Sequence, residues 1–328
     1  MTTTNQFNIL DQLRARFLMV ELKGTTGIRA SVRYEQGKAL IVATKGGDDS
    51  AYSVSQKLYP KGFDEHKNHL TKAYNAVRSH FYAHAMPFQH NASGSSQGKR
   101  LVANDQTISG SFLAEHQNLI DQLDRDREAF ARAIPRIVDD IEQAGVLGAD
   151  FARGNYPSPD EVRASYTYEP LVPMPIPGEE TLDGLPVPPD MAQTMSDTMQ
   201  RQAESEYRFG VQSQARETLD YLKTMASNLS RLVEWHNSSD DQRSKRQPAV
   251  YESLFTNVEH AASKLRAFAI PETQEGSRML EIAEAIEATL RPGDVHAEDV
   301  RTDLTLAEQA ASRAEAMANA IEEVGLLD

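Results

Sequence analysis

Two histidines one helical turn apart, His80 and His84, are the first residues whose spacing could support chemistry. Side chains at positions i and i+4 of a helix share a face, and two imidazoles placed in this way can bind one metal ion. A zinc metalloprotease motif requires a glutamate directly after its first histidine. The string His-Phe-Tyr-Ala-His has a phenylalanine there. Since no third ligand is apparent, we predict packing or surface roles for the histidines between His66 and His90. We predict no metal and no cofactor.

A second pattern, Gly94-Ser95-Ser96-Gln97-Gly98, matches the written form of a nucleophile elbow. That elbow needs a buried strand before it and a helix after it. Here the flanking residues are polar or basic, which is typical of a linker. Acidic pairs at 139–140 and 240–241 lack the differently tuned environments that acid–base catalysis needs. We therefore predict no catalytic residue and a protein that is not an enzyme, with an unrecognised hydrolase as the alternative.

Charge is unevenly distributed along the chain, whose net charge is −14. Residues 1–100 hold 14 Lys/Arg and 7 Asp/Glu, whereas residues 271–328 hold 4 and 14. A basic end can bind phosphates or the acidic end of another copy. If nucleic acid is bound, the contacts expected are Arg29, Arg33, Lys38 and Lys45.

Other features of the composition limit the compartment. The chain has no cysteine, which excludes disulfides and thiolate metal sites and fits a reducing compartment. It has no run of 18 apolar residues that could span a membrane, and its first residues do not resemble a signal peptide. We predict a cytoplasmic protein without membrane contact.

The stretch 189–236 is the most regular in the sequence. Apolar residues recur there at steps of three and four, which predicts a single amphipathic helix of roughly 70 Å. Such a stripe must be covered by other helices, from this chain or from a second copy. The three methionines of the stripe could instead form a docking site, because methionine suits adaptable binding grooves. The expected interface residues are Met191, Met195, Met199, Tyr207, Val211, Leu219, Leu222, Leu229 and Val233.

The fold class predicted from these patterns is mainly α, an elongated helical bundle with one very long helix and a small antiparallel β element near the N-terminus. Short β-prone runs at 17–22, 28–34 and 39–43, separated by glycines, favour a small sheet or hairpin. A capping box at Ser158 and Glu161 predicts a short helix that begins at Pro159. The expected regions are a basic α/β region (1–60), a helical region (61–170), a proline-rich extended segment (171–188) and a long-helix bundle with acidic C-terminal helices (189–328).

The order of these motifs resembles a known family. The string AVRSHFYAHAMPF at 76–88 precedes a long helix, the capped segment YPSPDEVR at 156–163, a proline-rich stretch and a second long helix. This order is similar to a family of uncharacterised phage and prophage proteins, a domain of unknown function, over residues 60–325. Phe88 stands where that family has a tryptophan. The resemblance implies a protein of the infected bacterial cytoplasm and, because some members are encoded near MoxR-like AAA+ ATPases, an adaptor or substrate of such a machine. It implies no catalytic residues.

Together these observations favour a non-enzymatic, phage-encoded protein that self-assembles or binds a partner protein through long amphipathic helices. The expected partner is a second copy or another phage or host protein. Two alternatives remain open: a nucleic-acid-associated accessory protein that uses the basic N-terminal region, and the AAA+ adaptor or substrate.

Overall fold

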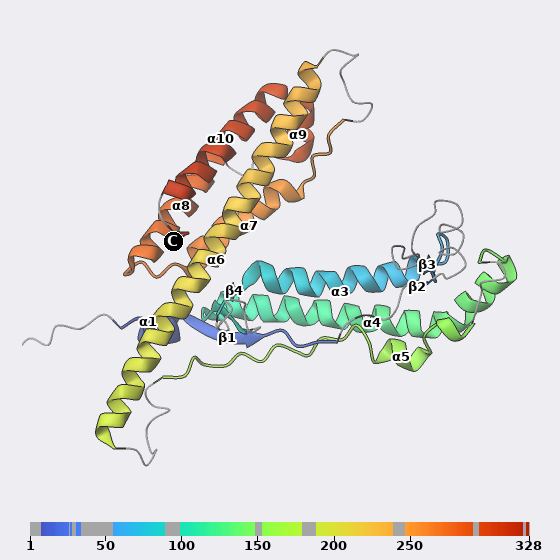
Figure 1. The fold of residues 1–328 in the computed structure, drawn as a ribbon, viewed down its shortest axis with the longest axis horizontal. Helices are drawn as coiled ribbons and strands as arrows, with labels where there is room; N and C mark the ends of the chain where they lie inside the picture. The colour runs from blue at the N-terminus through green and yellow to red at the C-terminus, as the bar shows by residue number, and fades with distance from the viewer. Residues whose placement is uncertain are drawn as a thin grey trace, which may run out of the picture. The chain divides into compact units, whose positions relative to one another are not determined.

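The chain divides into two compact units, and each unit is built from separated stretches of sequence. Unit 1 comprises residues 1–21, 82–110 and 172–328, and unit 2 comprises residues 22–81 and 111–171. The prediction of a mainly α fold with one very long helix and a small antiparallel sheet is confirmed (Figure 1). The structure, a computed structural model, describes residues 8–25, 27, 31–33, 55–88, 99–147, 153–178, 188–238, 247–290, 295–323 and 326–327.

Unit 1 is organised around α6 (Pro189–Asn237), which matches the predicted helix 189–236 to within one residue. Helices α7 (Ser253–Phe268), α8 (Gln274–Leu290) and α10 (Leu304–Glu323) contact it, as Figure 1 shows. The apolar row of α6 is therefore covered by helices of the same chain over most of its length. The buried members of the predicted interface are Tyr207, Val211, Leu219, Leu222 and Leu229, and Val233 packs half-buried against them.

Small and polar side chains decide how the helices of unit 1 approach α6. The buried face of α10 is mostly alanine, which allows two helix backbones to come close together; a short helix, α9 (Ala297–Thr302), precedes it.

The hydroxyl of Tyr207 donates to the carbonyl oxygen of Phe268 at 3.2 Å and accepts from the backbone N–H of Ile270 at 3.0 Å. Burial raises the pKa of Tyr207 to about 12. This hydroxyl therefore fixes the end of α7 to α6.

The sheet of unit 1 has the strand order β1-β5-β4. Strand β1 (Phe17–Glu21) follows helix α1 (Ile9–Arg16) and pairs antiparallel with β5 (Lys99–Ala103), which pairs with β4 (Met86–Pro87). The sequence favoured one small sheet or hairpin made of β1 and the β-prone runs 28–34 and 39–43. Residues 31–33 pair instead with 55–57, so the pairing of β1 with the first run is wrong, and the run 39–43 lies outside the described residues. Burial explains the observed partner, because Met19 and Val20 of β1 and Leu101 and Val102 of β5 are all buried.

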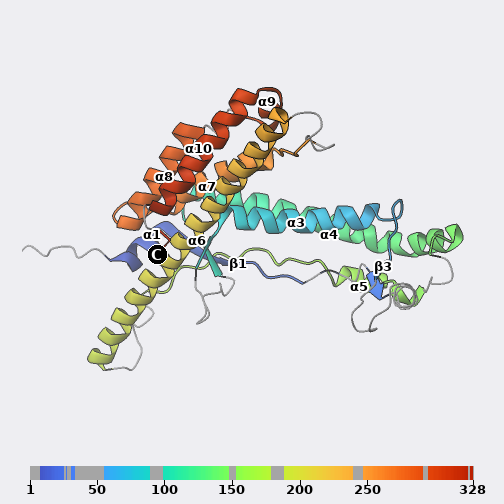
Figure 2. The same cartoon turned by 45° about the horizontal axis from the view of Figure 1, so that its top comes forward.

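Unit 2 contains most of α3 (Glu65–His84) and of α4 (Gln106–Ala144), which lie side by side in Figures 1 and 2. Helix α4 runs through Pro135 without a restart. Apolar side chains before and after it hold both halves in one core. These are Phe130, Ala131, Ile134, Val138 and Ile141.

Short elements complete unit 2. Strand β2 (Ser31–Arg33) pairs antiparallel with β3 (Ser55–Lys57), and a 3₁₀ turn, η3 (Arg153–Asn155), precedes α5 (Pro159–Arg163). The predicted capping box of α5 is confirmed: Ser158 Oγ accepts from the N–H of Glu161 at 3.2 Å, and Glu161 Oε2 accepts from the N–H of Ser158 at 2.7 Å. Across the described ranges of both units, each helix is too short or too polar to span a bilayer.

Candidate partner-binding surface

The N-terminal turns of α6 are the part of the long helix that the bundle leaves exposed. Met191 is 51% exposed, Met195 and Met199 are half-buried, and complete burial begins at Ala203. Because these methionines lie at i, i+4 and i+8, they share one side of the helix. We call Met191, Met195 and Met199 the methionine strip. In Figures 1 and 2 this end of α6 extends beyond α1 and away from α7, α8 and α10.

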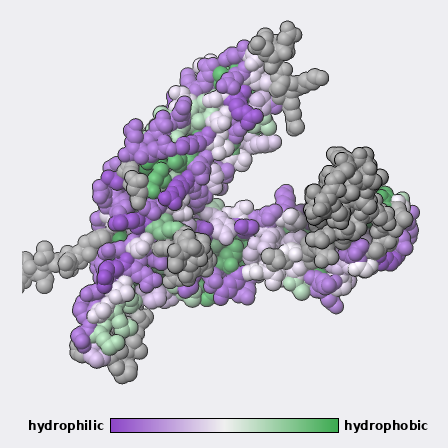
Figure 3. All heavy atoms as spheres, in the orientation of Figure 1, coloured by the Kyte–Doolittle hydropathy of each residue, from purple (hydrophilic) through white to green (hydrophobic). Residues whose placement is uncertain are grey.

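Polar residues beside the methionines stabilise this end of α6 through hydrogen bonds within the helix. Thr198 Oγ1 donates to the carbonyl oxygen of Thr194 at 2.7 Å, and Gln193 Nε2 donates to Asp197 Oδ1 at 2.9 Å. In Figure 3 the same end shows pale and green spheres on one side and purple spheres on the other. Local bonds therefore support the helix here, while the methionines pass from the exposed Met191 to Met199, which packs against the core of unit 1.

A small pocket lies where the methionine strip meets the core of unit 1. Its volume is about 90 Å³. Two of its side chains carry polar groups, Gln202 and Glu206, and Glu206 is only 5% exposed. Strip and pocket are continuous because Met199 belongs to both. The apolar lining residues are Leu10, Phe88, Ile176, Pro177, Met199 and Ala203.

A buried ionic group on α7 anchors α6 further along the bundle. Lys264 is 5% exposed, and its Nζ donates to Glu217 Oε2 at 2.7 Å and to the carbonyl oxygen of Tyr82 at 3.2 Å. Burial lowers the pKa of Lys264, and the carboxylate of Glu217 opposes that shift. Tyr221 donates to the other oxygen of Glu217 at 3.0 Å. Sequence reasoning missed this group; its one signal was a lysine within the apolar row of α7.

His80 and His84 lie one turn apart at the C-terminal end of α3, and His80 also meets a histidine of α4. His80 Nδ1 lies 3.4 Å from Nδ1 of His116 on α4, and its Nε2 lies 3.5 Å from a carboxylate oxygen of Glu115. The ring of His80 stacks on Phe112 with a centroid separation of 5.2 Å. In the part of the chain that the structure describes, no group of three or more acidic or histidine side chains is arranged to hold a metal ion.

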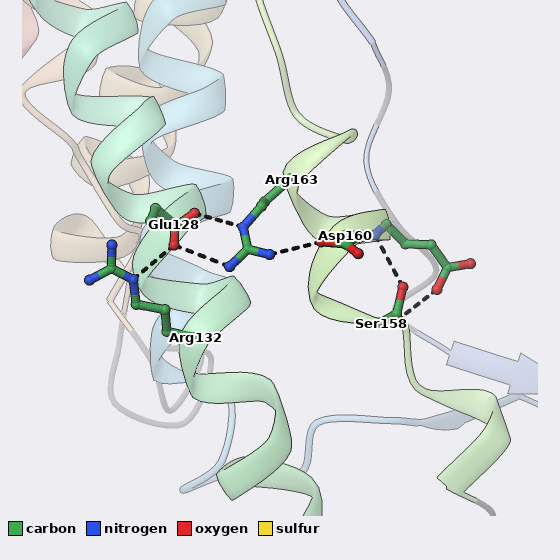
Figure 4. A network of polar contacts seen from close by, with 6 residues as sticks. Glu128, Arg132, Ser158, Asp160 and Arg163 are labelled. Atoms are coloured by element: carbon green, nitrogen blue, oxygen red, sulfur yellow. Dashed lines mark hydrogen bonds and ion pairs between the residues drawn. The ribbon is translucent and has the colours of Figure 1, made fainter.

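A surface network in unit 2 joins α5 to α4, as Figure 4 shows. Glu128 accepts from Arg163 Nε at 2.9 Å and from Arg132 Nε at 2.8 Å, and Arg163 also contacts Asp160 at 2.8 Å. Arg163, followed by Arg132, lowers the pKa of Glu128 from 4.5 to about 2. Since two arginines meet two carboxylates, this network links two helices and does not present a net charge to a ligand.

The remaining sequence candidates do not converge on a site. Of the proposed nucleic-acid contacts, Arg29, Lys38 and Lys45 lie outside the described residues, and Arg33 is placed only as backbone of β2. The glycine-serine pattern at 94–98 and the acidic pair at 240–241 also lie outside the described residues. The other acidic pair is divided between two arginines, because Asp139 contacts Arg153 at 2.8 Å and Asp140 contacts Arg136 at 3.6 Å.

Comparison with protein-family models, curated proteins and solved structures gives no match to this chain. The resemblance to the phage family therefore stays a prediction.

Proposed function

We propose that this chain is a non-enzymatic protein that binds another protein through the methionine strip and the adjoining pocket. One observation carries the proposal. The apolar row of α6 is covered by its own bundle from Ala203 onward, whereas Met191 at the other end of the same row is 51% exposed. An exposed apolar helix face that leads into a pocket is a common way to bind a helical segment. The adaptability of methionine also suits such an interface.

The partner under this proposal is a protein, which includes a second copy of this chain. The phage origin, the infected bacterial cytoplasm and the role with an AAA+ ATPase remain predictions that rest on the resemblance alone. Nucleic-acid binding has no support from the described residues, because three of its four candidate contacts lie outside them.

Photo-crosslinking tests the proposal in bacterial cells that express the full chain. A photo-reactive methionine analogue should form adducts with a protein at Met191 and Met195, and the double variant M191L/M195L should lose them. Met174, which is 37% exposed in the extended segment of unit 1, is the matched control position. An adduct containing two copies of this chain would identify the partner as the chain itself. Adducts at Met174 with none at the strip would contradict the proposal.

A further inference from the structure

The size and lining of the pocket beside the methionine strip restrict what it can hold. At about 90 Å³ it is smaller than a cavity of roughly 150 Å³ that accepts benzene. A narrow, flexible side chain therefore fits it better than an aromatic ring. The walls formed by Leu10, Phe88 and Ile176 are almost fully buried, so they favour a methylene chain.

Glu206 adds a requirement for charge. It lines the pocket and is 5% exposed, so its carboxylate is largely shielded from water. Glu206 already has an interaction within the chain, but each carboxylate oxygen can accept more than one hydrogen bond, so the side chain can take a further donor. Apolar walls beside a carboxylate match a side chain with a methylene stem and a cationic end, which describes lysine.

The wall of the pocket formed by α6 favours a basic partner as well. Between residues 190 and 206, Arg201 is the one basic residue among four acidic ones. The opposite wall is less acidic, because Arg14 of α1 lies against Gly178, next to Pro177. Complementary charge of this kind increases association rates and discriminates against acidic partners. The four acidic residues are Asp190, Asp197, Glu204 and Glu206.

We propose that the pocket receives a lysine side chain from a basic, amphipathic segment of the partner protein, with the stem between Leu10 and Met199 and the ammonium at Glu206. The inference rests on the proposed function and adds the identity of the anchoring residue. The methionine strip would contact the apolar residues on either side of that lysine.

Binding to model peptides tests this inference with the full-length protein. The first probe is an amphipathic helical peptide with one lysine in its apolar face, and the second replaces that lysine with norleucine. Methionine methyl groups labelled with ¹³C report binding by NMR, with the Met199 signal assigned from M199L. A hydrogen bond between an ammonium and a carboxylate is stronger than one between neutral groups. The lysine peptide should therefore bind roughly tenfold or more tightly than the norleucine peptide.

Variants of α6 locate the effect. E206Q should remove the preference for lysine, while E204Q, which changes an exposed glutamate two residues away, should retain it. If E206Q does not fold, Q202K is the second variant, because residue 202 is exposed and lies one turn before Glu206. The new ammonium should pair with the carboxylate of Glu206 and so lower the affinity for the lysine peptide about tenfold. Q202L controls for the loss of the amide.

The outcomes separate this inference from the proposed function. Equal binding of the lysine and norleucine peptides would overturn the proposal that the pocket binds lysine. If n-butylammonium binds as tightly as the lysine peptide, the ligand is a free amine, and the proposal is overturned as well. Binding that is unaffected by E206Q and Q202K would also overturn it. None of these results removes crosslinking at Met191 and Met195, whose absence would refute protein binding at the strip itself.

Discussion

Glu128 shows how single side chains fasten one helix to another in unit 2. Its carboxylate meets Arg163 of α5 and Arg132 of α4, and these contacts lower its pKa to about 2. All the partners are partly exposed, so solvent and salt screen the interaction. Lys264 and Glu217 form the contrasting pair, in which the lysine is buried and its carboxylate partner opposes the lowering of its pKa by burial.

The lowered pKa of Glu128 predicts a pH dependence of stability. The pKa in the folded chain is below its ordinary value of 4.5, so the ionised form stabilises the fold. That contribution is fully present above pH 4.5 and is lost as the pH falls toward 2. We expect the difference in unfolding free energy between wild type and E128Q to be constant near neutrality and to vanish over that acidic interval. Chemical denaturation at a series of pH values measures it.

A control on α8 makes this result specific. E284Q changes an exposed glutamate in unit 1. The difference in unfolding free energy between wild type and E284Q should not change comparably as the pH falls. A difference between wild type and E128Q that stays the same down to pH 2 would show that the arginines do not stabilise the carboxylate.

At the scale of elements, close packing of α6 depends on the glycine within it. A Cβ added to Gly210 would lie 2.7 Å from the carbonyl oxygen of Pro87 and 2.9 Å from Cε of Met86. The first distance involves backbone, which cannot yield as a flexible side chain can. Gly210 therefore permits α6 to pack directly on β4.

Paired glycine substitutions test this packing. Glycine to alanine inside a helix normally stabilises it by about 1 kcal/mol. G210A should instead destabilise unit 1 by about 1–3 kcal/mol, because the new methyl group overpacks the contact. G110A is the matched change in α4, where an added Cβ has nothing within 4 Å, and it should be neutral or stabilising. Urea unfolding compares the two, and a gain in stability from G210A would contradict the packing.

Local patterns in the sequence predicted individual helices and caps better than they predicted which segments contact one another. The repeat along 189–236 and the capping box at Ser158 depend on neighbouring residues, and both predictions are confirmed. The pairing of β1 with β5 joins residues about 80 positions apart, so local patterning could not identify it. For the same reason the contact of Lys264 with Glu217 was missed. The methionine strip was visible in the sequence, but its exposure depends on where the other helices end.

For the whole molecule, two separate hydrophobic cores predict two unfolding transitions. One core lies in unit 1 and the other in unit 2. Trp235, the one tryptophan of the chain, lies on α6 and so reports on unit 1. Phe130 is fully buried in unit 2, and F130A should cost unit 2 about 3–5 kcal/mol. We expect F130A to shift part of the helical circular-dichroism transition in urea while the tryptophan fluorescence transition stays in place.

The reciprocal variant completes the test. F255A removes a buried ring from unit 1 and should shift the tryptophan transition instead. If F130A moves both signals together, the two units unfold cooperatively and the expectation of separate transitions is wrong.

The division of unit 1 among residues 1–21, 82–110 and 172–328 also has a consequence for synthesis. Every residue of unit 2 has left the ribosome once position 171 emerges, whereas β1 and β5 must wait for the C-terminal half before the bundle can enclose them. Unit 2 should therefore mature first on the nascent chain, although it is not the N-terminal unit. Helix α1 and strand β1 are then among the last parts to become protected from proteases.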